Sequence, residues 1–123
     1  MADYSKAHGR GEASRLELLH NATTLLAMPH PYLSATKVRP AVVVHAPHPS
    51  QDSLIAPLTS RLSTLLSGEF TLEDWAKAGL NVPTAVKRGI YTIHPSLIVR
   101  FLGRLSTQDA QSLQRSLRGW LGL

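Results

Sequence analysis

The chain has 123 residues, of which 43% are hydrophobic and 17% are charged; these proportions fit one globular domain and exclude a disordered chain. Because it contains no cysteine, a disulfide framework and a thiolate metal site are both excluded. Its apolar runs are too short for a membrane span or a signal peptide, so we expect a cytoplasmic protein that does not enter a membrane.

The formal net charge of +5 is unevenly distributed. Residues 1–74 contain six Lys or Arg and seven Asp or Glu, whereas residues 75–123 contain seven Lys or Arg and a single acid, Asp109. A field of one sign attracts polyanions. The charge pattern therefore leaves three alternatives open: an RNA ligand, an acidic protein partner, and basic side chains that only aid solubility.

The first 20 residues are polar and contain glycine, and three leucines at positions 16, 18 and 19 do not complete an amphipathic stripe. A helix of this length is marginal in water. We therefore expect an N-terminal extension over residues 1–20, which either is flexible or docks its leucines on the body. A single domain should follow over residues 21–123.

Strand-forming runs dominate the next part of the chain. Residues 21–28 predict a first strand that stops at the prolines of PHPY. Residues 41–44 (AVVV) have no polar alternation, so they predict a central strand covered on both faces. Pro40 lacks the N–H that a ladder needs and should mark the start of that strand. It would hold Arg39 at a rigid entrance, where a guanidinium suits a phosphate.

The following stretch, LIAPLTS at residues 54–60, predicts another strand and a bend. The hydroxyl of Thr59 could donate to a phosphate oxygen, or it could cap a local turn. Thr71 is a possible N-cap and Gly79 a possible C-terminal stop, which predicts a short inserted helix carrying Trp75. We expect Trp75 to be a core or lid residue rather than a stacking platform.

Residues 81–106 predict two more strands, the second of them packed around Arg100. The tail is the clearest helix, because Ser106 and Asp109 have the spacing of a capping box. Its apolar face comprises Ala110, Leu113, Leu117, Trp120 and Leu121, and the opposite face carries Arg115 and Arg118. Short strands with a small inserted helix and a closing helix favour a compact β-barrel over βαβ units.

Four stretches together resemble one protein family. They are KVRPAVVV (37–44), LIAPLTS (54–60), LEDWAKAGLNVPTAV (72–86) and TIHPSLIVRFLGRLS (92–106). In order and spacing they are similar to the MazF/PemK toxins of bacterial type II toxin–antitoxin systems. The resemblance implies a mainly β, SH3-like barrel and a homodimer that is neutralised by an acidic antitoxin. It also implies a metal-independent endoribonuclease that cleaves single-stranded RNA through attack by the ribose 2′-OH.

The resemblance also assigns roles to residues. It implies that Arg39 and Thr59 are catalytic, and that Lys37, Ser60, Arg61, Lys87 and Arg88 bind RNA. The Gly-rich loop with which the family covers its RNA site is missing here, and His30 and Tyr32 are the side chains that could take its place in binding RNA. Some family members add an Arg/Asp pair near the position of Lys87 and Arg88, and this sequence has no acid there. Since an imidazole pKa suits a general base, His30 is the candidate for that role.

The histidines and the C-terminal residues bear on other possible functions. The chain has six histidines, of which only His45 and His48 are close in sequence, and no carboxylate cluster accompanies them; we expect no metal and no cofactor. The ending GWLGL (119–123) is similar to the aromatic tail with which CcdB-like toxins of the same fold poison DNA gyrase. A gyrase poison and a catalytically silent RNA-binding protein are therefore the alternatives.

Overall fold

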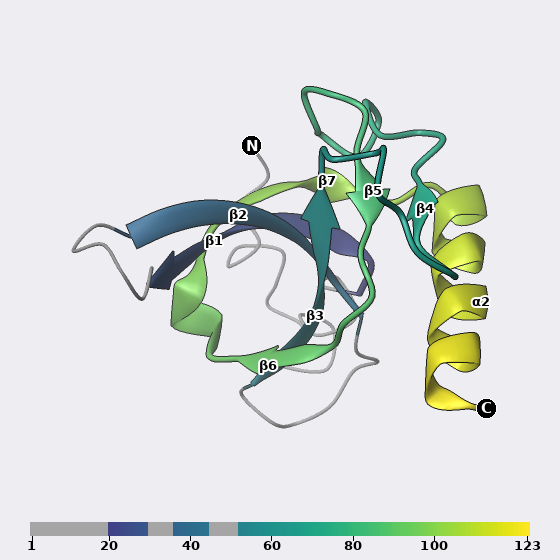
Figure 1. Ribbon diagram of the computed structural model, residues 1–123. Coiled ribbons are helices and arrows are strands. Elements are labelled where there is room, and N and C mark those ends of the chain that lie inside the picture. Colours follow the sequence, from purple (N-terminus) through teal and green to yellow (C-terminus); the bar gives the residue numbers. More distant parts are fainter. Residues whose placement is uncertain (1–19, 30–35, 45–51) are drawn as a thin grey trace.

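The structure is a computed structural model that describes residues 20–29, 36–44 and 52–123 (Figure 1). The predicted N-terminal extension, except for His20, lies outside these residues. The elements in chain order are β1 (Ala22–Pro29), β2 (Thr36–Val43), β3 (Ser53–Thr59), β4 (Phe70–Thr71), β5 (Ala85–Val86), β6 (Tyr91–Ile93), the 3-10 helix η2 (Pro95–Leu97), β7 (Ile98–Arg104) and α2 (Thr107–Leu121). No helix in the described part of the chain is long and apolar enough to cross a membrane.

The protein is mainly β, as predicted, with one antiparallel sheet and a C-terminal helix. The strand order is β4-β5-β3-β2-β1-β7, and β6 pairs with β3 outside this path. Figure 1 shows the strands curling round, with η2 linking β6 to β7. Within the described residues no ladder joins β6 to β7. The described strands therefore form a curled sheet, in which closure into a barrel is not detected.

Strand β2 is central and covered on both faces, as predicted. Val42 packs with Leu113 of α2 in one core cluster, whereas Ala41 and Val43 pack with Ile55 in a second cluster under β6 and β7. All three β2 side chains are buried. Because successive strand residues point to opposite faces, the uninterrupted apolar run is what allows β2 to separate two cores.

Pro40 was predicted to mark the start of the central strand, but it lies inside β2. Residues 36–42 of β2 pair with β1, and Pro40 stands opposite Leu25. The ladder with β3 starts only at Ala41. A residue without an N–H is tolerated here because this half of β2 has a neighbour on one side only. The same half, which carries Arg39, consequently extends past β3 and leaves its side chains accessible.

The predicted inserted helix is absent, because residues 73–79 form turns. Thr71 belongs to β4, so it is not an N-cap. The N–H groups of Glu73 and Asp74 instead donate to the two carboxylate oxygens of Asp109, each at 2.9 Å. Gly79 has a φ of 87° and ends these turns, but it is not the predicted stop of a helix, because no helix precedes it. Trp75 packs against the core, as expected.

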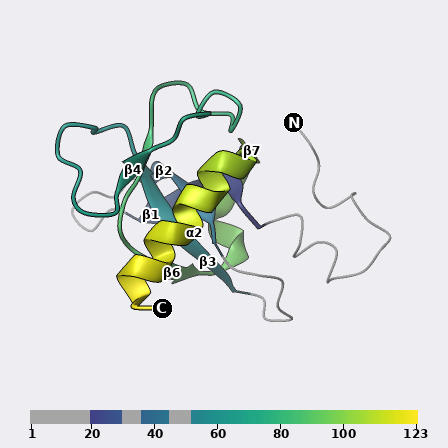
Figure 2. The same ribbon diagram turned by 90° about the vertical axis from the view of Figure 1, so that its right-hand side faces the viewer.

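Helix α2 covers one face of the sheet (Figure 2). Ser106 is its N-cap and accepts the Asp109 N–H at 3.2 Å, as predicted. The other half of the capping box is missing, because the Asp109 carboxylate binds the 73–74 backbone. Four of the five predicted apolar residues, Ala110, Leu113, Leu117 and Trp120, do face the core. Leu121 is 55% exposed, so its assignment to that face was wrong.

Residues 81–106 contain three strands and η2 rather than the two predicted strands. Gly89, with a φ of 151°, separates β5 from β6. This angle is accessible to glycine and not to other residues without strain. The first strand runs one residue past its predicted end, to Pro29, and the third coincides with its prediction within one residue.

Candidate functional site

Arg39 and Thr59 lie just beyond the last paired residues of β2 and β3, and both line the same two clefts. The ladder pairs Ala41 with Pro57 and Val43 with Ile55. Extended by two residues, the same register places Arg39 across from Thr59. Arg39 is two residues from Ala41, and Thr59 is two residues from Pro57. Because side chains alternate along a strand, Arg39 and Thr59 belong to the same face of the sheet. The two residues predicted to be catalytic are thus brought together by the strand register.

Two clefts meet at this pair. Both are lined by Arg39, Pro40, Leu58 and Thr59, which we call the Arg39–Thr59 ridge. The first cleft holds about 410 Å³ and is also lined by Leu25, Ser60, Arg61, residues 79–82, Thr84, Arg100 and Leu102; we call it the arginine cleft. The second holds about 350 Å³ and is also lined by Leu26, Ala41, Ile55, Pro57, Lys87, Arg88 and Tyr91; we call it the tyrosine cleft.

The bend after β3 is held by Thr59. Its Oγ1 accepts the backbone N–H of Arg61 at 3.0 Å, which is the local turn that the sequence left open as one of two alternatives. A hydroxyl that accepts one hydrogen bond still has its own proton to donate. The turn therefore fixes Ser60 and Arg61 beside the arginine cleft while Thr59 keeps a donor for a ligand.

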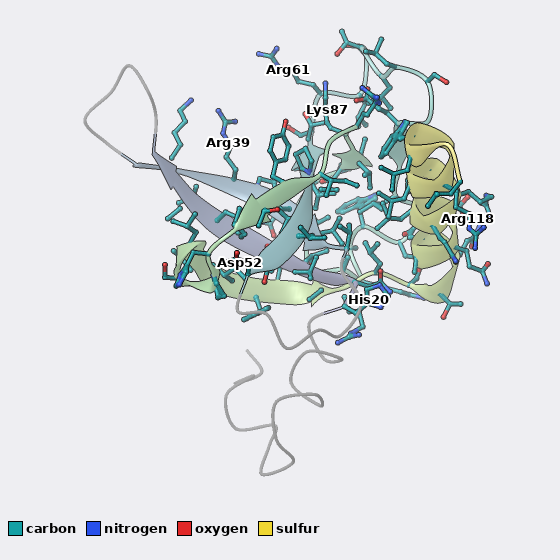
Figure 3. All side chains as sticks on the ribbon, turned by 90° about the horizontal axis from the view of Figure 1, so that it is seen from below. His20, Arg39, Asp52, Arg61, Lys87 and Arg118 are labelled. Atoms are coloured by element: carbon teal, nitrogen blue, oxygen red, sulfur yellow. The ribbon has the colours of Figure 1, made fainter. Side chains whose placement is uncertain are left out.

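Three arginines around the ridge have no acidic partner in the described part of the chain. No ion pair joins a described carboxylate to Arg39, Arg61 or Arg100. Figure 3 shows Arg39, Arg61 and Lys87 projecting from the same end of the molecule, whereas Arg118 points away from the body on α2. Unpaired guanidinium groups beside a cleft favour an anionic ligand, and their fork of donors matches a phosphate.

Lys87 and Arg88 are accompanied by a carboxylate that the sequence analysis missed. Glu69 Oε2 accepts the Arg88 N–H at 2.9 Å and lies 3.8 Å from Lys87 Nζ. Its other oxygen accepts the Leu66 N–H at 2.7 Å. These two backbone donors lower the pKa of Glu69, and the N–H of Arg88 has the larger effect. A carboxylate that accepts two backbone N–H groups and pairs with an ammonium positions the rim of the tyrosine cleft and is poorly suited to act as a general base.

The predicted site residues divide into three groups. Six of them line the two clefts: Arg39, Thr59, Ser60, Arg61, Lys87 and Arg88. Lys37 is exposed on β2, two residues before Arg39, but lines neither cleft. His30 and Tyr32 lie outside the described residues, so their roles stay predictions. The histidines at 45 and 48 also lie outside, and the described residues contain no cluster of three metal-ligating side chains.

Two further residues of the clefts were not assigned from the sequence. Arg100 lines the arginine cleft and Tyr91 the tyrosine cleft. Arg100 does leave a signal, since it is the one charged residue in the apolar run 97–102. Tyr91 leaves none, because its position depends on how β6 pairs with β3.

Comparison with solved structures shows the same fold at low sequence identity. An endoribonuclease in complex with its cognate antitoxin from a mycobacterial species aligns with a TM-score of 0.66 and 16% identity, over 85% of this chain and 95% of that chain. The Mycobacterium tuberculosis toxin MazF-mt6 gives 0.66 and 21%, over 83% and 97%. MazE-MazF from Deinococcus radiodurans gives 0.62 and 18%, over 85% and 94%.

No curated protein sequence matches the chain significantly. The family model of the PemK-like, MazF-like toxins of type II toxin–antitoxin systems matches residues 26–121. That match runs from within β1 to the end of α2, and so includes both sides of the Arg39–Thr59 ridge. The chain therefore belongs to the family of PemK-like, MazF-like toxins.

Proposed function

We propose that this protein is the toxin of a type II toxin–antitoxin system and cleaves single-stranded RNA as a metal-independent endoribonuclease. Family membership supports the toxin role, and two of the similar solved structures are described as endoribonucleases from mycobacterial species. The observation that carries the proposal is that Arg39 and Thr59 lie together on a ridge between two clefts rimmed by cations.

The chemistry that this ridge can support needs no metal. The ribose 2′-oxygen attacks the adjacent phosphorus, the bond from phosphorus to the 5′-oxygen breaks, and the products are a 2′,3′-cyclic phosphate and a 5′-hydroxyl. Arg39 would bind the two non-bridging phosphate oxygens with its guanidinium fork, and Thr59 would donate its hydroxyl proton to one of them. Both contacts strengthen as negative charge builds on the phosphorane.

Two proton transfers complete the reaction. A base removes the 2′-OH proton, and an acid protonates the leaving 5′-oxygen. His30 is our candidate for the base because its imidazole titrates near neutrality. Glu69 is not a candidate, since its carboxylate already accepts the N–H groups of Leu66 and Arg88.

The decisive experiment compares Arg39→Ala, Arg39→Lys and wild type in EDTA on a single-stranded RNA. Loss of one pre-organised transition-state contact should lower the cleavage rate by about 100-fold. Melting should hardly change, because Arg39 is exposed and pairs with no described carboxylate. Lysine keeps the charge but not the fork, so it should restore RNA binding more than turnover.

Arg118→Ala is the matched control, since it removes an exposed arginine from the outer side of α2. It should cleave at the wild-type rate. An Arg39→Ala protein that melts lower than wild type yet cleaves RNA equally fast would remove Arg39 from the active site. Binding of RNA without cleavage by the wild type would favour the catalytically silent alternative.

We also propose two protein partners for this cytoplasmic toxin. An acidic antitoxin suits the seven cations and single acid of residues 75–123, and two of the similar structures are complexes of a toxin with its antitoxin. A second copy of the chain would give a homodimer, which adds stability to a small core. Co-purification from the native operon tests the antitoxin, and sedimentation at micromolar concentration tests the dimer.

The gyrase-poison alternative gains no support from the tail. Trp120 packs against the core, and its Nε1 donates to the Ser67 carbonyl at 3.1 Å. The ring therefore fastens α2 to the body and is not presented to a partner. Leu123 is exposed, but without the aromatic ring it offers little of the tail on which that alternative depends.

A further inference from the structure

The two clefts beside the Arg39–Thr59 ridge differ in chemistry. The arginine cleft adds Arg61 and Arg100 to the ridge, and residues 79–82 also line it. The tyrosine cleft has an apolar floor that includes Ile55 and Pro57. One cleft thus offers fixed positive charge, whereas the other offers an apolar surface with cations at its rim.

Tyr91 is pre-positioned in the tyrosine cleft. Its backbone pairs with Ile55 in the β3–β6 ladder. Its ring lies against the bare α-carbon of Gly89, where an added Cβ would come within 2.9 Å of Tyr91 Cε2 and 3.3 Å of its hydroxyl oxygen. The residue is nevertheless 54% exposed. An aromatic ring that is held in place and still accessible loses little conformational entropy when a planar ligand stacks on it.

Arg100 lies on the other side of the ridge, in the arginine cleft. It stands in β7 opposite Leu25. Although β7 is three ladders away from β3, Arg100 lines the same cleft as Arg61. Neither arginine has a described carboxylate as an ion-pair partner. Charge without a partner in a polar cleft is suited to the phosphate backbone and carries no information about base identity.

We propose that the clefts divide the RNA between them: the tyrosine cleft binds one nucleobase next to the scissile phosphate by stacking on Tyr91, and the arginine cleft binds the backbone phosphate on the other side through Arg61 and Arg100. This inference rests on the proposed function, since it takes the ridge as the position of the scissile phosphate. It assigns base preference to one side of the cut and general affinity to the other.

The test measures binding and cleavage with two variants, Tyr91→Ala and Arg100→Ala. Binding is measured by fluorescence anisotropy with a 2′-O-methyl single-stranded oligonucleotide, which cannot be cleaved. Tyr91→Ala should weaken binding by about 10-fold, typical of one lost stacking contact, and should leave the salt dependence unchanged. Arg100→Ala should reduce the slope of log K against log salt by about 0.7, as expected for one lost phosphate contact on a single strand.

Cleavage of a random-sequence RNA supplies the second measurement. Sequencing of the product ends should show that Tyr91→Ala flattens the base preference on one side of the cut only, whereas Arg100→Ala slows cleavage without changing that preference. Tyr91→Phe should recover most of what Tyr91→Ala loses, because it keeps the ring. An abasic nucleotide at the stacked position should abolish the difference between wild type and Tyr91→Ala.

The outcomes separate this inference from the proposed function. If the wild type cleaves RNA in an Arg39-dependent way but the two variants behave alike, the division of the clefts is wrong and the endoribonuclease proposal stands. If the wild type binds RNA without cleaving it, the proposed function fails while the anisotropy experiment still decides the inference. If the wild type does not bind the oligonucleotide, both are overturned. Arg118→Ala serves as the control for a lost surface cation in both measurements.

Discussion

Asp109 and Arg39 carry opposite charges and are used in opposite ways. The carboxylate of Asp109 is 1% exposed and accepts the N–H groups of Glu73 and Asp74. Arg39 is exposed and has no described acidic partner. We define the helix side as α2 together with residues 66–80. There the charged group of Asp109 forms hydrogen bonds that hold the fold. At the cleft end, formed by the ridge and the two clefts, charge is left for a ligand.

The helix side owes its order to contacts between residues far apart in sequence. Ser116 Oγ donates to the Gly68 carbonyl at 2.7 Å, and the Thr23 hydroxyl donates to the Ala78 carbonyl. A Cβ on Gly79 would collide with the backbone of Leu102, so this turn lies directly on β7. Because Gly79 and Leu80 of the helix side also line the arginine cleft, the helix side helps to shape that cleft, while the three arginines that line it come from elsewhere in the chain.

The first test of this division is Trp120→Ala, which should have the largest effect on stability. The change removes indole packing from the core cluster and the hydrogen bond to Ser67. We expect the free energy of unfolding to fall by about 3 kcal/mol, measured by urea denaturation. Cleavage per folded molecule, assayed well below the melting temperature, should stay near the wild-type rate.

Leu123→Ala is the control, because Leu123 is 83% exposed and should contribute almost nothing to stability. A Trp120→Ala protein that unfolds like wild type but has lost toxicity would contradict this division between the helix side and the cleft end. It would show that the tail serves a partner rather than the fold.

The elements that could be predicted from the sequence are those whose cause is local. The run 41–44 predicts a doubly covered strand, and the apolar spacing of α2 with the Ser106 cap predicts the helix. The prediction of an inserted helix was wrong because the structure of that segment depends on a residue far away in sequence. Thr71 has the local spacing of a cap, but the N–H groups of Glu73 and Asp74 are satisfied by a carboxylate about 35 residues away.

The candidate site shows the same limit. Arg39 and Thr59 could be named from their motifs, and the register of one ladder is enough to place them opposite each other. Glu69, Tyr91 and Arg100 could not be placed in this way. Their positions depend on β4, β6 and β7 curling round the sheet, which no spacing within the sequence specifies.

The second test is Asp109→Asn, which keeps the size of the side chain and exchanges one carboxylate oxygen for an NH₂ group. That group cannot accept a hydrogen bond, so the N–H of Glu73 or of Asp74 loses its partner. We expect a loss of about 2 kcal/mol in the free energy of unfolding. Glu73→Gln, at an exposed position, is the control. Unfolding of Asp109→Asn at the wild-type denaturant concentration would mean that these N–H groups have other partners.

The third test concerns Glu69, which connects the two regions and should have the smallest effect. Its neighbours Ser67 and Gly68 bind α2, while its own carboxylate holds Lys87 and Arg88 at the rim of the tyrosine cleft. The N–H groups of Arg88 and then Leu66 lower its pKa from the ordinary 4.5. A carboxylate with a lower pKa in the folded state stabilises the fold at neutral pH.

The sign of the pH dependence follows from that shift. The contribution of Glu69 is complete above its unfolded pKa and disappears as the pH falls through its lower folded pKa. The melting temperatures of wild type and Glu69→Gln should therefore differ by a constant amount between about pH 7 and pH 5.5, and the difference should shrink below about pH 4.5. Glu73→Gln, which changes an exposed acid, is the comparison variant in the same pH series. A difference that stays constant down to pH 3 would show that the Gln side chain disturbs packing, and that the ionised carboxylate is not what joins the helix side to the cleft end.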